Sequence, residues 1–299
     1  MKPLPLSFYL QVVLCAALWG SAFPVIKLSY EALAVEGFGE RMVFAGIRFM
    51  IAGLIIVPFC RSSVLGTLKR APKGNLLWII LGQTFFQYVF FYYALSVSSG
   101  TLGALLGGAG SFWWMFLAPI FQKTAMPSKK HWAILLVCAC GISIAVYAPG
   151  AGSGNVMLGS TAFLLASLSG AMGAIGLKRI SINHGSRAIT SISLFVGGLM
   201  LLLVGAPSGW TGFWADLKPS AFGSLAYLSF LSATAFTVWN RLIEQYSVNV
   251  LSAYRFLIPL FGVVESALLV PTESIGPGIV FGGLMIVTSL FVSGRIKDN

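Results

Sequence analysis

Ten long apolar stretches divide this chain, and each is long enough to cross a membrane as a helix. A helix rises about 1.5 Å per residue, so about 20 residues cross a hydrocarbon core of about 30 Å. Because a segment without water must satisfy its own backbone groups, all ten are predicted to be helical. The expected spans are 7–28, 41–60, 75–97, 100–121, 130–148, 157–178, 188–206, 219–243, 249–270 and 276–294.

Composition and charge favour the same class. Of the 299 residues, 57% are hydrophobic and only 9% are charged, which is unlike a soluble domain of this length. A net charge of +11 would suggest a nucleic-acid partner in a soluble protein. Here the basic residues are dispersed over short connections, where they meet anionic headgroups. We therefore expect the lipid bilayer as a partner and no nucleic acid.

The basic residues also alternate from one connection to the next. Lys and Arg gather at 60–75, 121–131 and 178–189, whereas the intervening connections are nearly bare. By the positive-inside rule, both chain ends are predicted to face the cytoplasm. The apolar run from Phe8 is too long for a signal peptide and nine spans follow, so we expect no cleavage. The prediction is a multi-pass protein of a bacterial-type inner membrane.

A weak internal repeat divides the chain in half. The segment at 19–22 has an echo at 169–172, an offset of about 150 residues. Each half, 1–150 and 151–299, then holds five spans, and an odd number makes the second half enter the membrane from the opposite side. Inverted repeats of this kind favour alternating access around a central site. Small residues recur in any polytopic protein, so the echo alone leaves a chance match open.

Short motifs in both halves carry a family resemblance. They lie at 19–27, 44–53, 93–100, 232–240, 256–261 and 282–283. In order and spacing, the chain resembles the drug/metabolite transporter superfamily, specifically its EamA-type ten-helix branch. The resemblance covers nearly the whole chain and implies a secondary transporter of small organic metabolites, often an exporter, of unspecified substrate. One departure is Gly110-Ser111 in the fourth span, near the place where the family usually has a proline.

Three charged residues fall inside predicted spans, where charge is costly. Arg48 could draw an anionic or carboxylate-bearing substrate inward, or it could snorkel outward or pair with a backbone carbonyl. For Arg255 we favour contact with headgroups or with Glu244. Glu265 is the candidate for binding a proton or a cationic group during transport, the alternative being a static pair with Arg48 or Lys27.

Further candidates for substrate binding are polar and aromatic residues at mid-depth. Gln83 and Gln87 lie one turn apart on one helix face, suited to a solute path or to interhelical hydrogen bonds. The glycines at 103, 107 and 110 are interpreted as close packing in preference to a cavity wall. The complete set of predicted substrate-binding residues is Trp19, Ser21, Arg48, Gln83, Gln87, Tyr88, Ser111, Trp114, Ser169, Met172, Trp239 and Asn240.

Several classes of function are disfavoured by what the sequence lacks. There is no GxxxxGK[ST] loop for ATP, and neither the two histidines nor the four cysteines form a set with metal-ligand or catalytic spacing. We expect no cofactor, no metal and no enzymatic activity. The alternatives that remain open are a pore for small solutes, whose flux would not saturate, and a membrane sensor without flux.

Overall fold

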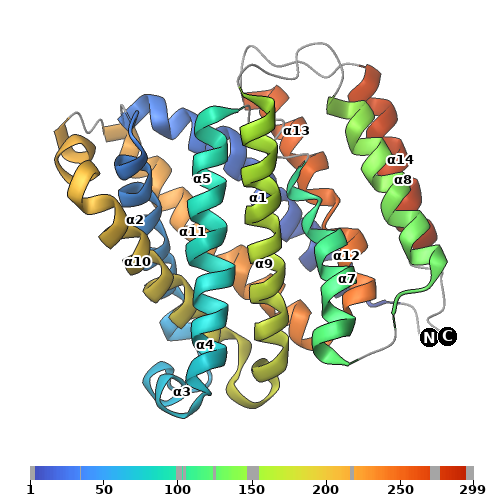
Figure 1. Cartoon of the computed structure of the whole chain (residues 1–299), viewed down its shortest axis with the longest axis horizontal. Helices are drawn as coiled ribbons and strands as arrows, with labels where there is room; N and C mark the ends of the chain where they lie inside the picture. Colours follow the sequence, from blue (N-terminus) through green and yellow to red (C-terminus); the bar gives the residue numbers. More distant parts are fainter. Residues whose placement is uncertain are drawn as a thin grey trace.

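All regular structure in the described part of the chain is helical. The structure is a computed structural model, and it describes residues 4–33, 35–98, 103, 106–123, 126–146, 155–215, 219–269 and 277–293. Figure 1 shows the helices lying side by side as one bundle. The predicted all-α fold class is confirmed in these residues.

The helices follow the predicted spans closely. The first half holds α1 (Leu6–Leu33), α2 (Phe38–Ile56), the short turn η1 (Val57–Phe59), α3 (Val64–Arg70), α4 (Lys73–Ile79), the π-helical segment η2 (Ile80–Phe86), α5 (Gln87–Val97), α7 (Gly110–Gln122) and α8 (Lys129–Val146). The second half holds α9 (Val156–His184), α10 (Ser186–Ala215), α11 (Pro219–Gln245), α12 (Val248–Tyr254), α13 (Leu257–Leu269) and α14 (Pro277–Ser293).

Seven segments of the described residues are long and apolar enough to cross a membrane. They are Leu6–Tyr30, Phe38–Phe59, Lys73–Val97, Met157–His184, Ser186–Ala215, Ser220–Gln245 and Val250–Leu269. The other three expected spans correspond to α7, α8 and α14. The seventh span was predicted too short, because α10 continues through Pro207 to Ala215.

Glycines set the contact between α2 and α10, which lie side by side in Figure 1. Gly39, Gly46 and Gly53 are seven residues apart, so they share one face of α2. A Cβ atom added to them would lie 2.8, 2.7 and 2.7 Å from backbone nitrogens of α10. Only glycine permits this approach, as is usual where membrane helices pack tightly.

The other helices pair around the centre of the bundle. α1 packs against α11 and α13, and α9 packs against α5, η2 and α7. α8 pairs with α14 at one edge of the bundle (Figure 1). The centre is therefore built by α1, η2–α5, α7, α9, α11 and the α12–α13 segment.

Three of these central segments depart from regular α-helix. η2 is a π-helical stretch, α7 is preceded by a turn at 108–109, and α12 and α13 are separated at 255–256. At both breaks the backbone makes tighter bonds of the i to i−3 type: Ser111 N–H donates to Gly108 O at 3.0 Å, and Ile258 N–H donates to Arg255 O at 3.0 Å. Pro259, which has no N–H to donate to Arg255, helps to cause the second break.

The expected ninth span is present, and its helix is interrupted at 255–256. Irregular backbone at membrane depth is tolerated where it is buried in protein or lines a cavity. π-Helical segments are also frequent at functional sites. These three departures therefore locate where a functional site can be sought.

Candidate functional site

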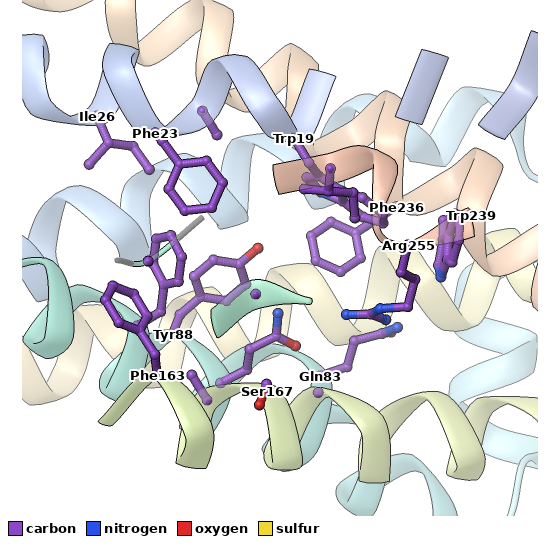
Figure 2. A pocket seen from close by; sticks show the side chains of 18 of the residues that line it. Trp19, Phe23, Ile26, Gln83, Tyr88, Phe163, Ser167, Phe236, Trp239 and Arg255 are labelled. Atoms are coloured by element: carbon purple, nitrogen blue, oxygen red, sulfur yellow. The ribbon is translucent and has the colours of Figure 1, made fainter. Parts of the chain in front are cut away.

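A cavity lies where the irregular segments meet. It is bounded by α1, α2, η2–α5, α9, α11 and the α12–α13 break, with Gly103 and Gly107 from the segment before α7. The residues that line it are Trp19, Ala22, Phe23, Ile26, Arg48, Gln83, Gln87, Tyr88, Phe91, Gly103, Gly107, Phe163, Ala166, Ser167, Gly170, Ala174, Phe236, Trp239, Arg255 and Ile258. Figure 2 shows aromatic side chains around much of the cavity and Arg255 and Gln83 reaching toward each other.

The wall is apolar and aromatic with a few polar groups. The Trp19 ring meets Phe236 and Trp239 edge-on, with centroids 5.4 and 5.6 Å apart. Elsewhere the centroid of the Phe91 ring lies 5.7 Å from that of Phe23 and 5.8 Å from that of Phe163. Concave sites that combine apolar walls with few polar groups are typical binding sites for small molecules.

Arg48 is buried by its neighbours and does not snorkel. Its exposure is 1%, and it reaches across from α2 to α11. Its Nε donates to Ser232 Oγ at 3.0 Å and to Leu228 O at 3.3 Å, and Nη1 donates to Tyr92 Oη at 3.0 Å. The predicted bond to a backbone carbonyl is present, and the same side chain lines the cavity. Its partners are neutral, so its charge is not balanced by a carboxylate among the described residues.

Arg255 lies on the cavity, which corrects the expected contact with headgroups or Glu244. It follows directly on α12, at the helix break, and its guanidinium is 6.0 Å from the centre of the Trp239 ring. Its Nε is buried with no hydrogen-bond partner among the described residues. Sequence reasoning treated it as an interfacial arginine because it assumed a continuous helix; Pro259, one turn later, was the signal for the break.

Gln83 is held by a buried amide network. Its Nε2 donates to Asn240 Oδ1 at 2.9 Å, and Asn240 Nδ2 donates back to Gln83 Oε1 at 3.2 Å and to Thr190 Oγ1 at 2.8 Å. Gln87, one turn further, lines the cavity without a hydrogen bond to a described residue. Gln83 thus makes an interhelical bond at the wall, whereas Gln87 lines the cavity with its amide next to Gly170.

Six of the twelve predicted substrate-binding residues line the cavity, and six lie elsewhere. Those that line it are Trp19, Arg48, Gln83, Gln87, Tyr88 and Trp239. Of the others, Asn240 supports Gln83 from behind, Ser21 bonds Tyr227 Oη at 2.6 Å, and Ser169 donates to Gly82 O at 3.0 Å. Ser111 and Trp114 are buried in packing, and Met172 is half-buried away from the cavity.

Gly103 and Gly107 both line the cavity, but the preferred interpretation as close packing is corrected only for Gly107, because a Cβ on Gly103 would lie 2.5 Å from the Phe163 ring. A Cβ on Gly107 would meet nothing within 4 Å, as expected beside open space. A Cβ on Gly110 would lie 2.9 Å from Arg255 Nη2. The absence of side chains here therefore leaves room for the cavity and for the arginine.

Glu265 is on α13 next to α1 and is half-buried. Its Oε2 is buried without a hydrogen-bond partner among the described residues, and a Cβ on Gly20 would lie 2.8 Å from it. The static pair with Arg48 or Lys27 is not formed, since Arg48 bonds other partners and Lys27 is exposed. Trp19, the residue before Gly20, lines the cavity, whereas Glu265 does not. The Glu265 carboxyl therefore lies beside the helix that forms this part of the wall.

A helical membrane bundle that encloses such a cavity among interrupted helices has the architecture of a membrane transport protein. Residues 157–295 match the model of the EamA-like transporter family. The uncharacterized transporter YvbV of Bacillus subtilis (strain 168) is 28% identical over 97% of this chain and 92% of its own length. The second half of the chain thus matches an EamA-type transporter of the drug/metabolite transporter superfamily, and the relatives of the whole chain are named as transporters, not as enzymes.

Two further relatives have names that include a substrate. A probable amino-acid metabolite efflux pump of Escherichia coli (strain K12) is 24% identical over 94% of this chain and 92% of its own. A probable terminal-alkyne amino-acid exporter of Streptantibioticus cattleyicolor is 24% identical over 92% and 91%. A solved structure superposes with a TM-score of 0.76 at 15% identity, over 97% of this chain and 98% of the other, which shows a shared fold.

Proposed function

We propose that this transporter is a secondary active carrier that exports small organic metabolites, such as amino acids or related compounds, by alternating access. The observation that carries the proposal is the cavity at the three helix interruptions. Transporter substrate sites typically lie near the bilayer midplane, where discontinuous helices meet. The cavity has a volume of about 110 Å³, of a size for a small solute.

The helix contacts support two inverted repeats, 1–150 and 151–299. In such repeats α1 corresponds to α9, η2–α5 to α11, and α7 to α12–α13. The contacts of α1 with α11 and α13 then correspond to those of α9 with α5 and α7, and both sets are present. The pairs α2 with α10 and α8 with α14 each correspond to themselves.

The two broken spans support the same repeat. The turn at 108–109 and the break at 255–256 lie at corresponding positions, an offset close to that of the sequence echo. Two halves of similar shape can exchange conformations about the cavity between them, which is the geometric basis of alternating access. The names of two relatives favour export, and the charge pattern favours cytoplasmic ends.

Flux in reconstituted vesicles tests the carrier. We expect uptake of a radiolabelled substrate to saturate with its concentration and to be stimulated by unlabelled substrate on the far side. A pore would instead give flux that rises linearly and shows no counterflow. A protein without flux for any tested metabolite would favour the sensor.

We propose that Glu265 binds the proton that is coupled to transport. Its buried carboxylate oxygen has no partner among the described residues, and α13 contacts α1 directly beside the cavity. Binding a proton would remove the cost of burying a charge there, and so link proton movement to the packing of α1 on α13. Replacement by glutamine fixes the neutral form.

Glu265→Gln is therefore expected to abolish the pH dependence of transport while leaving exchange of substrate across the membrane intact. The measurement compares proton-driven flux with counterflow in the same vesicles over a range of pH. Unchanged pH dependence in Glu265→Gln would remove Glu265 from the mechanism.

A further inference from the structure

The charge of the cavity wall is one-sided. Two arginines line it, Arg48 from α2 and Arg255 from the break after α12, and its described lining includes no Asp or Glu. Tyr88, which carries a hydroxyl, lines the same cavity. In a site of low dielectric, charges of one sign favour a ligand of the other sign far more strongly than they would in water.

The two arginines differ in what they can still bind. Arg48 already makes three hydrogen bonds and is fixed between α2 and α11. The Nε of Arg255 is buried and makes no hydrogen bond to a described residue. A guanidinium has five N–H donors in a planar fork that matches a carboxylate. An unsatisfied buried donor is costly, so a ligand that supplies its acceptor is favoured.

The surroundings of Arg255 complete a site for an anion with an apolar chain. The Trp239 ring centre lies 6.0 Å from the Arg255 guanidinium. The Trp19 ring contacts Trp239 and Phe236, and together these rings form an apolar wall. The free Gln87 amide and the Tyr88 hydroxyl also line the cavity and can contact polar atoms next to the carboxylate. An ammonium group would find no carboxylate among the described lining residues.

We infer that the cavity selects organic carboxylates that lack a neighbouring ammonium group, such as 2-oxo acids or N-acylated amino acids, and that Arg255 binds the carboxylate. This inference rests on the proposed function, because it takes the cavity to be the transport site. It also narrows that function: among compounds related to amino acids, the anions are preferred to the zwitterions.

Three probes with the leucine skeleton isolate charge from shape. The 2-oxo acid of leucine is an anion, leucine is a zwitterion and leucinamide is a cation near neutral pH, and all three have the same number of non-hydrogen atoms. Their affinities for the purified protein are measured by isothermal titration calorimetry. We expect the 2-oxo acid to bind about tenfold or more tightly than leucine, and leucinamide to bind weakest. Equal or tighter binding of leucinamide would overturn the inference without any variant.

Arg255→Gln tests the assigned residue. It should weaken binding of the 2-oxo acid by about tenfold or more and leave leucinamide unchanged or improved. Arg241→Gln is the matched control, because Arg241 is an exposed arginine on α11 close in sequence to Trp239. Loss of leucinamide and 2-oxo acid binding in equal measure would contradict the inference, since it would indicate a general packing role.

Gly110→Ala provides a second variant that retains every charge. The added methyl would meet Arg255 Nη2 at 2.9 Å, so the flexible guanidinium must shift. Binding of the 2-oxo acid should weaken while thermal stability stays near that of the parent protein. Unchanged affinity together with a folded protein would count against Arg255 as the carboxylate ligand.

Binding and flux separate this inference from the proposed function. If the purified protein prefers the anion but vesicles show no flux, the anion site is supported and the carrier function is contradicted. If flux of leucine or leucinamide saturates and does not change in Arg255→Gln, the carrier function is supported and the anion preference is contradicted.

Discussion

Asn240 shows how single side chains set the cavity. It is fully buried on α11 and holds the Gln83 amide in a fixed orientation while donating to Thr190 on α10. Three helical segments are thus joined by polar bonds behind the cavity wall. Such bonds are modest in membrane proteins individually, but their loss leaves buried groups unsatisfied.

Asn240→Ala is expected to lower the free energy of unfolding by about 1–3 kcal/mol, because Gln83 and Thr190 lose their partner. The change can be measured by denaturation in mixed micelles. Asn183→Ala is the control, since Asn183 is exposed near the end of α9 and should change stability by less than about 0.5 kcal/mol. An equal effect of the two substitutions would show that the amide network does not stabilise the fold.

At the scale of secondary-structure elements, the close contact between α2 and α10 depends on glycines, which have no side chain. α2 meets α10 through glycines on both helices, and a Cβ on Gly46 would lie 2.7 Å from Leu202 N and 2.8 Å from Gly198 O. Both neighbours are backbone atoms, which cannot rotate away. The helices would have to separate along their whole contact.

Gly46→Ala should therefore destabilise the protein by about 1–3 kcal/mol, as overpacking of a close contact does. Gly223→Ala supplies the comparison: Gly223 is an exposed glycine inside α11 with nothing within 4 Å, so alanine should be neutral or stabilising by up to about 1 kcal/mol. Thermal unfolding of both variants measures the difference. A tolerated Gly46→Ala would mean that α2 and α10 are less tightly packed than described.

At the element scale, hydropathy predicted where helices lie but not where they break. Apolar length gave positions close to those of the helices because membrane insertion responds to the same quantity. The π-helical segment around Gln83 and the break after α12 were not predicted, because hydropathy averaged over a whole span does not resolve a local change of backbone geometry. Pro259 and the glycines before α7 were the available indications, and the glycines were interpreted as close packing.

At the scale of the whole molecule, six of the twelve predicted substrate-binding residues line the cavity. Polar residues such as Gln83, Gln87 and Arg48 were found because polarity inside a span needs a reason. Phe91, Phe163 and Phe236 were missed because an aromatic residue in a span is ordinary until the neighbouring helices are in place. Arg255 was misassigned because depth along the chain does not give depth in the bundle when the helix is broken.

The central claim is that one cavity opens to each side of the membrane in turn. Ser167→Cys, in a variant whose four native cysteines are replaced by alanine, places a thiol of nearly serine size on the cavity wall. The measurement is its labelling by a membrane-impermeant reagent in right-side-out and in inside-out vesicles. We predict labelling from both faces and protection by transported substrate. Labelling from one face alone, under every substrate and pH condition, would contradict alternating access.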